Sequence, residues 1–412
     1  MTENNVEAAH VDDSVGHDRV SHAGGRTSRT GALVNWVMGR GTAMPAIVSL
    51  IAIAVFFQWR SQYFLSPTNL GNLAVQITLV AIIAMGEVVV LLLGEIDLSL
   101  GSLVGVTAAI LGVLMANYGL PWYVAVPLMI VCGAGFGAFQ GAWISLLGIP
   151  SFVVTLAGLM AFLGLQLWIL GPQGTMSVFD PTIAAITGTT LPAFASWVLA
   201  AGLVAAILGT TVMAVARGRR SARALGLPLI LSALALVVTA LFNASRGVPT
   251  AFLLLLVMLA VGWWITERTV PGRHLFAVGG NAEASRRAGL PVSKIRLLAF
   301  TASGMLAAVG GLFAVSYNGS AGTLTGGGTL LLEAIGAAVI GGTSLIGGRG
   351  TMWSALLGAL IMGGVSNGLD LMEADQPVKY MVQGAIVLFA VSLDTILRRR
   401  QSRGRQPGGA RG

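Results

Sequence analysis

The chain has 412 residues, of which 55% are hydrophobic and only 10% are charged. Soluble globular domains carry about 25% charged residues, so this composition excludes an ordinary soluble protein. Apolar runs of about 20 residues, the length that an α-helix needs to cross a bilayer, recur along the whole chain. The sequence therefore predicts an all-α protein, a polytopic transmembrane helical bundle.

Twelve membrane spans can be placed, which at about 20 residues each fit the length of the chain. They are 43–59, 70–93, 98–117, 122–147, 150–170, 195–216, 224–242, 250–267, 295–317, 329–346, 351–372 and 378–397. Residues 1–41 are polar and contain no apolar segment like that of a signal peptide, so we expect a disordered cytoplasmic tail. Residues 42–397 would then form the transmembrane domain, and residues 398–412 a basic cytoplasmic tail.

The basic residues predict how the bundle is oriented. With the N-terminus in the cytoplasm, 21 of the 24 Lys and Arg residues fall on the inner side of the membrane, as the positive-inside rule requires. The exceptions are Arg60, Arg246 and Lys379. We therefore expect an even number of spans and both termini inside, in a multi-pass protein of the inner (cytoplasmic) membrane. The net charge of +8 then serves orientation and contact with anionic membrane lipid, and no nucleic acid is expected as a partner.

Motifs for nucleotide or metal chemistry are missing from the sequence. A P-loop ends in Gly-Lys-Ser or Gly-Lys-Thr, but the two lysines, Lys294 and Lys379, follow Ser293 and Val378. Any ATP-driven work would therefore use ATP bound by a partner subunit. Only His274 lies outside the N-terminal tail and no His-Glu-x-x-His motif occurs, which argues against a zinc hydrolase. We expect no enzymatic activity, no cofactor and no metal.

The inner loop 268–294 contains a predicted short helix, 281–290, whose two ends are both marked. Asn281 can cap the N-terminus, Glu283 favours the helix dipole, and Gly289 supplies a left-handed residue at the C-terminus. The further markers are Arg286 and Arg287 in the last turn, Pro291 as a stop, and a small side made of Ala284, Ala288 and Leu290. Two turns alone are unstable in water. This helix therefore suits docking into a groove of a partner or, alternatively, a membrane surface where lipid headgroups hold it.

Motifs distributed between residues 70 and 397 together carry a family resemblance. They are Glu95-Ile96-Asp97-Leu98-Ser99, Pro150-Ser151-Phe152-Val153-Val154-Thr155-Leu156-Ala157-Gly158, Gly247-Val248-Pro249-Thr250, Gly279-Gly280-Asn281-Ala282-Glu283-Ala284 continuing to Gly289, and Ile340-Gly341-Gly342-Thr343-Ser344-Leu345-Ile346-Gly347-Gly348. In combination they resemble the sugar permeases of binding-protein-dependent ABC importers. An extra stretch at roughly 210–245 is similar to the xylose-type permeases, which implies ten family-like spans plus an extra pair.

The resemblance implies partners and roles. Helix 281–290 would be the coupling helix that meets an ABC ATPase subunit, through Asn281, Glu283, Ala284, Arg286, Arg287 and Gly289. An extracytoplasmic sugar-binding protein would deliver the sugar, and a second copy of the chain would complete a homodimer around one path. The sequence departs from the family twice. Relatives commonly show Glu-Leu-Asp-Ala-Ile before the Gly-Gly-Thr-Ser run, where this chain has only Glu333 as a carboxylate, and Glu87 stands where an apolar residue is frequent.

Polar side chains inside the spans are candidates for the translocation path. A charged group in a span usually faces the bundle interior or water, which singles out Glu87, Asp97 and Glu333. A hydrogen bond to a neighbouring helix explains Glu87 equally well, and Asp97 can instead cap the next helix. Sugar recognition also needs hydroxyl partners and an apolar face, for which the candidates are Asn72, Gln76, Gln140, Trp143, Phe152, Thr155 and Asn367. Each amide can equally be an interhelical hydrogen bond.

Glycine spacing adds two expectations. The stretches 94–101 and 341–348 share the pattern Gly-x-x-x-Leu-x-x-Gly, either as an internal repeat of the kind that transporters use or by coincidence in a glycine-rich chain. Gly133, Gly137 and Gly141 recur at a spacing of four and predict a close helix-packing face.

Together these features favour a permease that moves a monosaccharide, xylose before others, by alternating access in an ATP-driven importer. Ribose, galactose, another small sugar or a nucleoside is the first alternative. The second is a transporter driven by an ion gradient, with Glu87 or Glu333 as proton carrier, which would work without an ATPase.

Overall fold

The computed structural model describes residues 43–217 and 225–403. The expected tail of residues 1–41, together with Arg219, Arg220 and Arg223 of one inner loop, lies outside this part. Residues 404–412 of the expected basic tail also lie outside it, whereas residues 398–403 continue the last helix.

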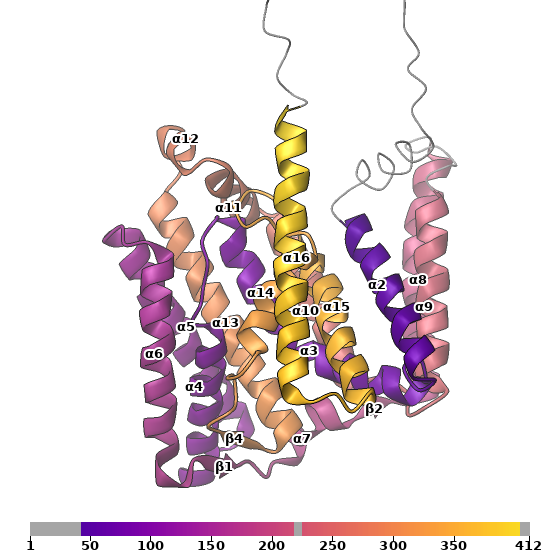
Figure 1. The fold of residues 1–412 in the computed structure, drawn as a ribbon, viewed down its shortest axis with the longest axis horizontal. Helices are drawn as coiled ribbons and strands as arrows, with labels where there is room; N and C mark the ends of the chain where they lie inside the picture. The colour runs from indigo at the N-terminus through magenta and orange to yellow at the C-terminus, as the bar shows by residue number, and fades with distance from the viewer. Residues whose placement is uncertain (1–42, 218–224, 404–412) are drawn as a thin grey trace, which may run out of the picture. The chain divides into compact units, whose positions relative to one another are not determined.

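The described chain folds almost entirely into helices (Figure 1). They are α2 (Ala43–Arg60), α3 (Pro67–Leu92), α4 (Leu100–Gly112), the π-helix η1 (Val113–Asn117), α5 (Trp122–Leu146), α6 (Ser151–Leu170), the 3-10 helix η2 (Gly171–Gln173), α7 (Pro181–Gly188), α8 (Ala193–Ala216), α9 (Gly226–Asn243), α10 (Thr250–Arg268), α11 (Val270–Gly280), α12 (Ala282–Arg287), α13 (Val292–Asn318), α14 (Leu330–Ile340), α15 (Trp353–Leu371) and α16 (Gln376–Arg403). Within the described residues, eight helical segments are long and apolar enough to cross a membrane. The predicted polytopic helical bundle is confirmed, while twelve spans and cytoplasmic termini stay predictions.

One predicted span is much shorter in the structure. The sequence predicts a span over 329–346, but α14 has only 11 residues. At 1.5 Å per residue it is about 16 Å long, roughly half of the hydrocarbon thickness. The helix ends at Gly341, and Gly342, with φ of 110°, turns the chain into the irregular segment 343–352. The glycines that mark the family motif are therefore also what shortens the helix.

The end of the bundle opposite α12 is closed by short paired strands (Figure 1). β1 (Thr175–Ser177) pairs antiparallel with β4 (Ser320–Gly322), and β2 (Thr190–Leu191) pairs with β3 (Val248–Pro249). Helix α7 lies between β1 and β2 and begins at Asp180, whose carboxylate accepts hydrogen bonds from two backbone N–H groups of its first turn. The sequence predicts only a long loop over 171–194, because pairing with strands that lie far along the chain leaves no local signal.

The centre of the bundle is formed by α3, α4 and α13. Nearly every side chain of α4 is buried, and most of the last 16 residues of α3 contribute to the same apolar core. Helix α13 packs against α3, α4 and α5. Because small side chains let two helix backbones approach closely, the predicted glycine face of α5 is placed where α13 needs it.

That glycine face is confirmed. A Cβ atom at Gly137 would collide with the carbonyl oxygen of Phe300, and one at Gly133 would lie 2.6 Å from the carbonyl oxygen of Gly304. At Gly141 a Cβ would lie 3.0 Å from Cβ of Phe300. All three positions are buried against α13, so this helix pair tolerates no side chain along the contact.

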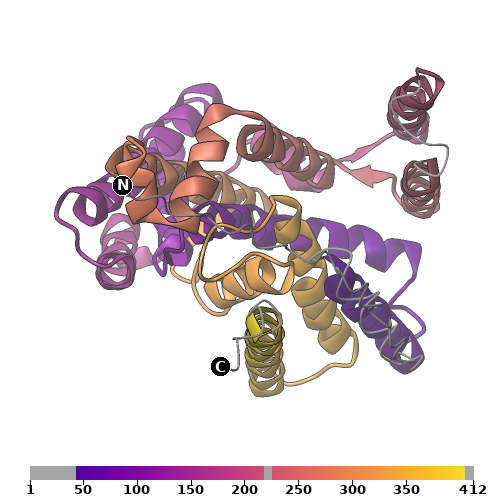
Figure 2. The same ribbon diagram turned by 90° about the horizontal axis from the view of Figure 1, so that it is seen from above.

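Helices α8 and α9, which include most of the extra stretch 210–245, form a pair. They contact one another, and α9 also contacts α3. Figure 2 shows the two helices side by side at one edge of the bundle. Most of the large apolar side chains of α9 are exposed, among them Ile230 and Leu234. This exposure suits contact with lipid.

We predict that Gly137→Ala destabilises the bundle while Gly135→Ala does not. A methyl group at Gly137 must displace the backbone at Phe300, and overpacking of this kind costs about 1–3 kcal/mol. Nothing lies within 4 Å of a Cβ at Gly135, where alanine should gain up to about 1 kcal/mol of helix propensity. Thermal unfolding in detergent measures both variants. Equal melting temperatures would show that α5 and α13 do not pack through this face.

Candidate coupling and transport site

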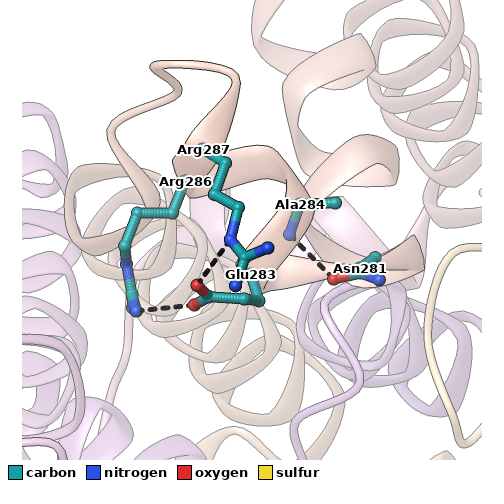
Figure 3. Close-up of polar contacts among 5 residues, drawn as sticks. All are labelled: Asn281, Glu283, Ala284, Arg286 and Arg287. Atoms are coloured by element: carbon teal, nitrogen blue, oxygen red, sulfur yellow. Dashed lines mark hydrogen bonds and ion pairs between the residues drawn. The ribbon is translucent and has the colours of Figure 1, made fainter.

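The segment between α11 and α13 forms the short helix α12 that the sequence predicts. The Asn281 side-chain oxygen accepts a hydrogen bond from the Ala284 N–H at 2.9 Å and so caps the helix. Glu283 forms ion pairs with Arg286 and Arg287, each at 3.2 Å (Figure 3). These ion pairs are solvent-exposed, so each contributes only a fraction of a kcal/mol. The cap and the charges hold the helix in place locally.

The outer face of α12 is free of other parts of the described chain. Ser285 is buried, whereas Ala284, Ala288 and Gly289 are exposed. Gly289 has a left-handed backbone with φ of 83°, which ends the helix as the sequence predicts. The exposed face is therefore small, basic at its C-terminal end and able to approach another backbone closely.

A groove runs beside α12, between its connection to α13 and the end of α5. It is lined by Ser145, Leu146, Arg286, Leu290, Pro291, Val292, Ser293, Lys294 and Leu297. Two basic side chains, Arg286 and Lys294, therefore face an apolar floor. This arrangement offers a partner both charge and apolar contact at the same place.

Three segments meet immediately before α12 through glycine backbones, and we call this contact the glycine junction. It joins the end of α3 (residues 92–94), the end of α11 (Gly279 and Gly280) and residues 346–348. A Cβ at Gly279 would collide with the carbonyl oxygen of Leu92. The Leu92 oxygen accepts a hydrogen bond from the Gly348 N–H at 2.9 Å. The three sequence stretches 94–101, 279–289 and 340–348, which are far apart along the chain, therefore meet at this junction.

The loop from Leu93 to Ser99, which we call the Glu95 loop, is also joined to α13. Arg296 donates from Nη2 to a carboxylate oxygen of Glu95 at 3.0 Å, and both side chains are largely buried. The sequence gives no local signal for this pair, because Glu95 and Arg296 are about 200 positions apart. Its one sequence signal is that Glu95 belongs to a motif, residues 95–99, on which the family resemblance rests.

Three pathway candidates of this end, Asp97, Gln140 and Thr155, belong to one buried network. Both the N–H and the hydroxyl of Ser99 donate to Asp97, at 2.9 and 2.7 Å, and the Gln140 side-chain amide donates to the Ser99 hydroxyl at 2.9 Å. Thr155 donates to the carbonyl of Ile96 at 3.3 Å. Burial raises the pKa of Asp97 to about 6, and the hydrogen bonds from Ser99 oppose that rise. The network ties the Glu95 loop to α5 and α6.

Trp143 and Phe152 do not join this network. Their side chains are exposed, at 44% and 53% of their surface, and Trp143 packs against Phe139 on the outside of α5. The apolar face that a sugar ring needs is therefore not assembled around Asp97 and Gln140 in this conformation.

A second group of candidates lies on α3 and α15, nearer the opposite end. Asn69 and Asn367 exchange two side-chain hydrogen bonds, at 2.7 and 3.1 Å, and Asn367 also donates to Gln76 at 3.4 Å. Asn72 and Gln76 are exposed on one face of α3. The sequence predicts Asn72, Gln76 and Asn367 here but misses Asn69, whose only signal is an amide at the start of a span.

Glu333 is in the first turn of α14, and its side chain contacts α16. One of its carboxylate oxygens accepts hydrogen bonds from the Thr329 hydroxyl at 2.9 Å and from the Gln383 amide at 2.8 Å. The Gln383 side-chain oxygen is buried and has no partner among the described residues. Glu333 thus links two helices, and it keeps a second oxygen that makes no hydrogen bond to the described residues. Gln383 was not predicted, although it is the only amide in the apolar stretch 378–397.

Glu87 lies close to Asp97 of the buried network, within range of its charge. It is fully buried in α3, and neither carboxylate oxygen makes a hydrogen bond within the described chain. An unpaired charge is costly at such a place. The structure does not provide the interhelical hydrogen bond that the sequence analysis considers for Glu87.

The model of the family described as the permease component of branched-chain amino acid transport systems matches residues 69–391. The chain belongs to this permease family. The match covers every motif on which the sequence resemblance rests, and the helices that hold α12, the glycine junction and both groups of polar candidates.

Individual relatives show which members of this permease family the chain resembles. The chain is 37% identical over 366 residues to the xylose transport system permease protein of Escherichia coli strain K12, which covers 86% of the chain and 92% of the relative. The corresponding protein of Haemophilus influenzae is 33% identical over 372 residues, 84% of the chain and 95% of the relative. The ribose import permease protein of Escherichia coli strain K12 is 28% identical over 350 residues, 85% and 92%. These relatives confirm the resemblance to xylose-type sugar permeases. No solved structure matches the chain.

We predict that Asn367→Ala lowers the free energy of unfolding by about 1–3 kcal/mol, because it leaves the side-chain oxygen of the buried Asn69 without a hydrogen-bond donor. The double variant Asn69→Ala/Asn367→Ala should cost less than the sum of the two single changes. Asn72→Ala, at an exposed position of the same helix face, should change stability by less than about 0.5 kcal/mol. Thermal melting of the purified permease tests this. A fully additive double variant would contradict a direct Asn69–Asn367 interaction.

Proposed function

We propose that the chain is the membrane-spanning permease of an ATP-driven importer that moves xylose across the cytoplasmic membrane by alternating access. The observation that carries the proposal is the likeness to xylose transport system permeases along nearly the whole length of both chains. The added pair α8 and α9 agrees with the extra stretch that the sequence shares with xylose-type permeases.

The proposed partner proteins would bind at the two opposite ends of the bundle. An ABC ATPase subunit would dock on α12 and the basic groove beside it, and would bind the ATP, since this chain has no P-loop. An extracytoplasmic sugar-binding protein would deliver the sugar at the end that carries α7 and the strands. A second copy of the chain would complete a homodimer around the path. Both termini would lie in the cytoplasm, with lipid around the apolar faces.

The permease itself would do no covalent chemistry. Movement of the ATPase subunits on binding ATP would displace α12, and the bundle would open alternately to the two sides. The contacts Asn281, Glu283, Ala284, Arg286, Arg287 and Gly289 would receive that movement. Such a change needs two packings of nearly equal free energy, which ATP binding and sugar binding then bias.

The polar groups that suit a sugar best are those with free capacity for hydrogen bonds. Asn72 and Gln76 present exposed amides one helical turn apart on α3, and Glu333 keeps a carboxylate oxygen that is not used by Thr329 or Gln383. Inside a membrane an exposed polar face needs water, protein or substrate beside it. We therefore place sugar contacts at these three residues, and assign Asp97, Gln140 and Thr155 to the internal network.

The alternatives make distinct predictions. In the first alternative the importer is the same but carries ribose, galactose, another small sugar or a nucleoside. The ribose import permease among the relatives supports this alternative. A transporter driven by an ion gradient would move substrate without an ATPase, with Glu87 or Glu333 carrying the proton.

The experiment that tests the function is uptake by proteoliposomes that contain this permease, its ATPase subunit and its sugar-binding protein. Xylose should enter only with ATP and all three components, and faster than ribose or galactose. Glu283→Arg breaks both ion pairs of α12, and Gly289→Pro removes its left-handed end. Each should abolish coupling between ATP hydrolysis and uptake, while Glu267→Arg, exposed at the end of α10, should not. Uptake by the permease alone would contradict the proposal.

For Glu333 we predict that Gln is tolerated and Leu is not. The side-chain oxygen of Glu333→Gln still accepts hydrogen bonds from Thr329 and Gln383, so ATP-driven uptake should fall only slightly. Glu333→Leu leaves the Gln383 amide unpaired, and uptake should fall about ten-fold, equivalent to about 1.4 kcal/mol of barrier. Near-parental rates in both variants would make Glu333 a bystander. Equal abolition would favour a proton-carrying role.

A further inference from the structure

The Glu95 loop contacts more of the bundle than its seven residues suggest. At its start, Gly94 and Leu92 lie in the glycine junction with the end of α11. In its middle, Glu95 forms the ion pair with Arg296 of α13. At its end, Ser99 joins Gln140 of α5. The loop and the residue before it, Leu92, therefore contact both helices that flank α12, and the loop also contacts α5.

The flanking contacts are placed close to α12 along the chain. Gly279 lies two residues before Asn281, the cap of α12, and Arg296 lies in the first turn or two of α13, which begins at Val292. The segments that join α12 to α11 and to α13 are short. A displacement of α12 is therefore passed to Gly279 and Arg296. Arg296 contacts the Glu95 loop directly, and Gly279 contacts Leu92, the residue immediately before the loop.

On its other side the loop is held by buried hydrogen bonds. Ile96 receives bonds from Thr155 and donates weakly to Ser151, both on α6, and Asp97 is held by Ser99. The Gln140 amide on α5 donates to Ser99 and both side chains are buried, so breaking that bond leaves the amide unpaired at a cost of about 1–3 kcal/mol. The loop cannot shift alone, and α4, α5 and α6 must follow it.

The ion pair leaves part of the Arg296 guanidinium unused. Arg296 uses one guanidinium nitrogen for Glu95, and its Nε is buried with no partner among the described residues. A guanidinium that is only partly satisfied has hydrogen-bonding capacity left for a second arrangement. Packed elements with two discrete arrangements are what carries coupling between distant sites.

We propose that the Glu95–Arg296 ion pair is the positioning contact that transmits displacement of α12 to the Glu95 loop and, through it, to α4, α5 and α6. Glu95 and Arg296 are positioning residues, since neither belongs to the candidate sugar contacts. This inference rests on the proposed function, because it presupposes that an ATPase subunit moves α12. It adds the route by which that movement enters the bundle.

The test is a charge swap measured as sugar imported per ATP hydrolysed in proteoliposomes with the ATPase subunit, the sugar-binding protein and xylose. Glu95→Arg and Arg296→Glu should each lower this ratio about five- to ten-fold, within the range of coupling between linked sites. ATP hydrolysis should continue. The double variant Glu95→Arg/Arg296→Glu restores opposite charges and should recover most of the ratio. A merely structural pair would change protein yield and melting temperature but not the ratio.

The opposite end of the chain offers a matched control. Lys379 and Asp370 form an ion pair between α16 and α15, far from α12. Reversing that pair one residue at a time should leave the coupling ratio unchanged. Where a charge reversal prevents folding, the neutral variants Glu95→Gln and Arg296→Met, alone and together, replace it and should lower the ratio in the same direction.

The outcomes separate this inference from the proposed function. Parental coupling ratios in the single variants, or a double variant no better than either, would overturn the Glu95–Arg296 route. If Glu283→Arg in α12 uncouples at the same time, the coupling helix stands and only the route is wrong. If the parental permease imports no xylose with its partners, the proposed function itself fails.

Discussion

Within the described residues, three chain segments approach one another closely where α3, α11 and the segment after α14 meet. A side chain at Gly279 would occupy the place of the Leu92 carbonyl oxygen, and one at Gly347 would lie 2.7 Å from both the Gly279 oxygen and the Gly94 nitrogen. Glycine at these positions lets the backbones of three chain segments approach one another closely. The position of α12, the irregular course of residues 343–352 and the placement of the Glu95 loop all depend on that contact.

The polar groups of the bundle separate into two sets with different demands. Near α12, Asp97, Ser99 and Gln140 satisfy one another and are buried, as expected for groups that fix helices in position inside a membrane. Toward the other end, Asn72, Gln76 and Glu333 keep hydrogen-bonding capacity that the described chain does not use. A permease needs both kinds, because one set must hold and move helices while the other exchanges hydrogen bonds with a passing sugar. Glu87 is buried near Asp97 of the first set, but its carboxyl makes no side-chain hydrogen bond within the described chain.

Features with local causes could be predicted from the sequence. The ends of α12 follow from Asn281 and Gly289, whose capping chemistry acts within a few residues, and the glycine face of α5 follows from a spacing of four. What depends on distant partners could not be predicted: the strands that pair across the loop 171–194, the Glu95–Arg296 ion pair, and the role of Gln383. The ten pathway candidates rest mainly on residue type, which does not separate buried members of a hydrogen-bond network from exposed amides. The two stretches that share a glycine pattern, 94–101 and 341–348, touch one another at Gly94 and Gly347, but Gly347 is not a glycine of the pattern, so the contact does not explain the shared spacing.

The central claim is that backbone contact at the glycine junction holds the Glu95 loop to the segment that carries α12. Hydrogen–deuterium exchange of the purified permease tests it most directly, with Gly279→Ala compared against Gly280→Ala, where a Cβ meets nothing within 4 Å. The account predicts faster exchange of residues 93–99 and of the Gly348 amide in Gly279→Ala only, since the added methyl group must push Leu92 away from Gly348. Unchanged exchange in Gly279→Ala, or the same increase in both variants, would contradict it.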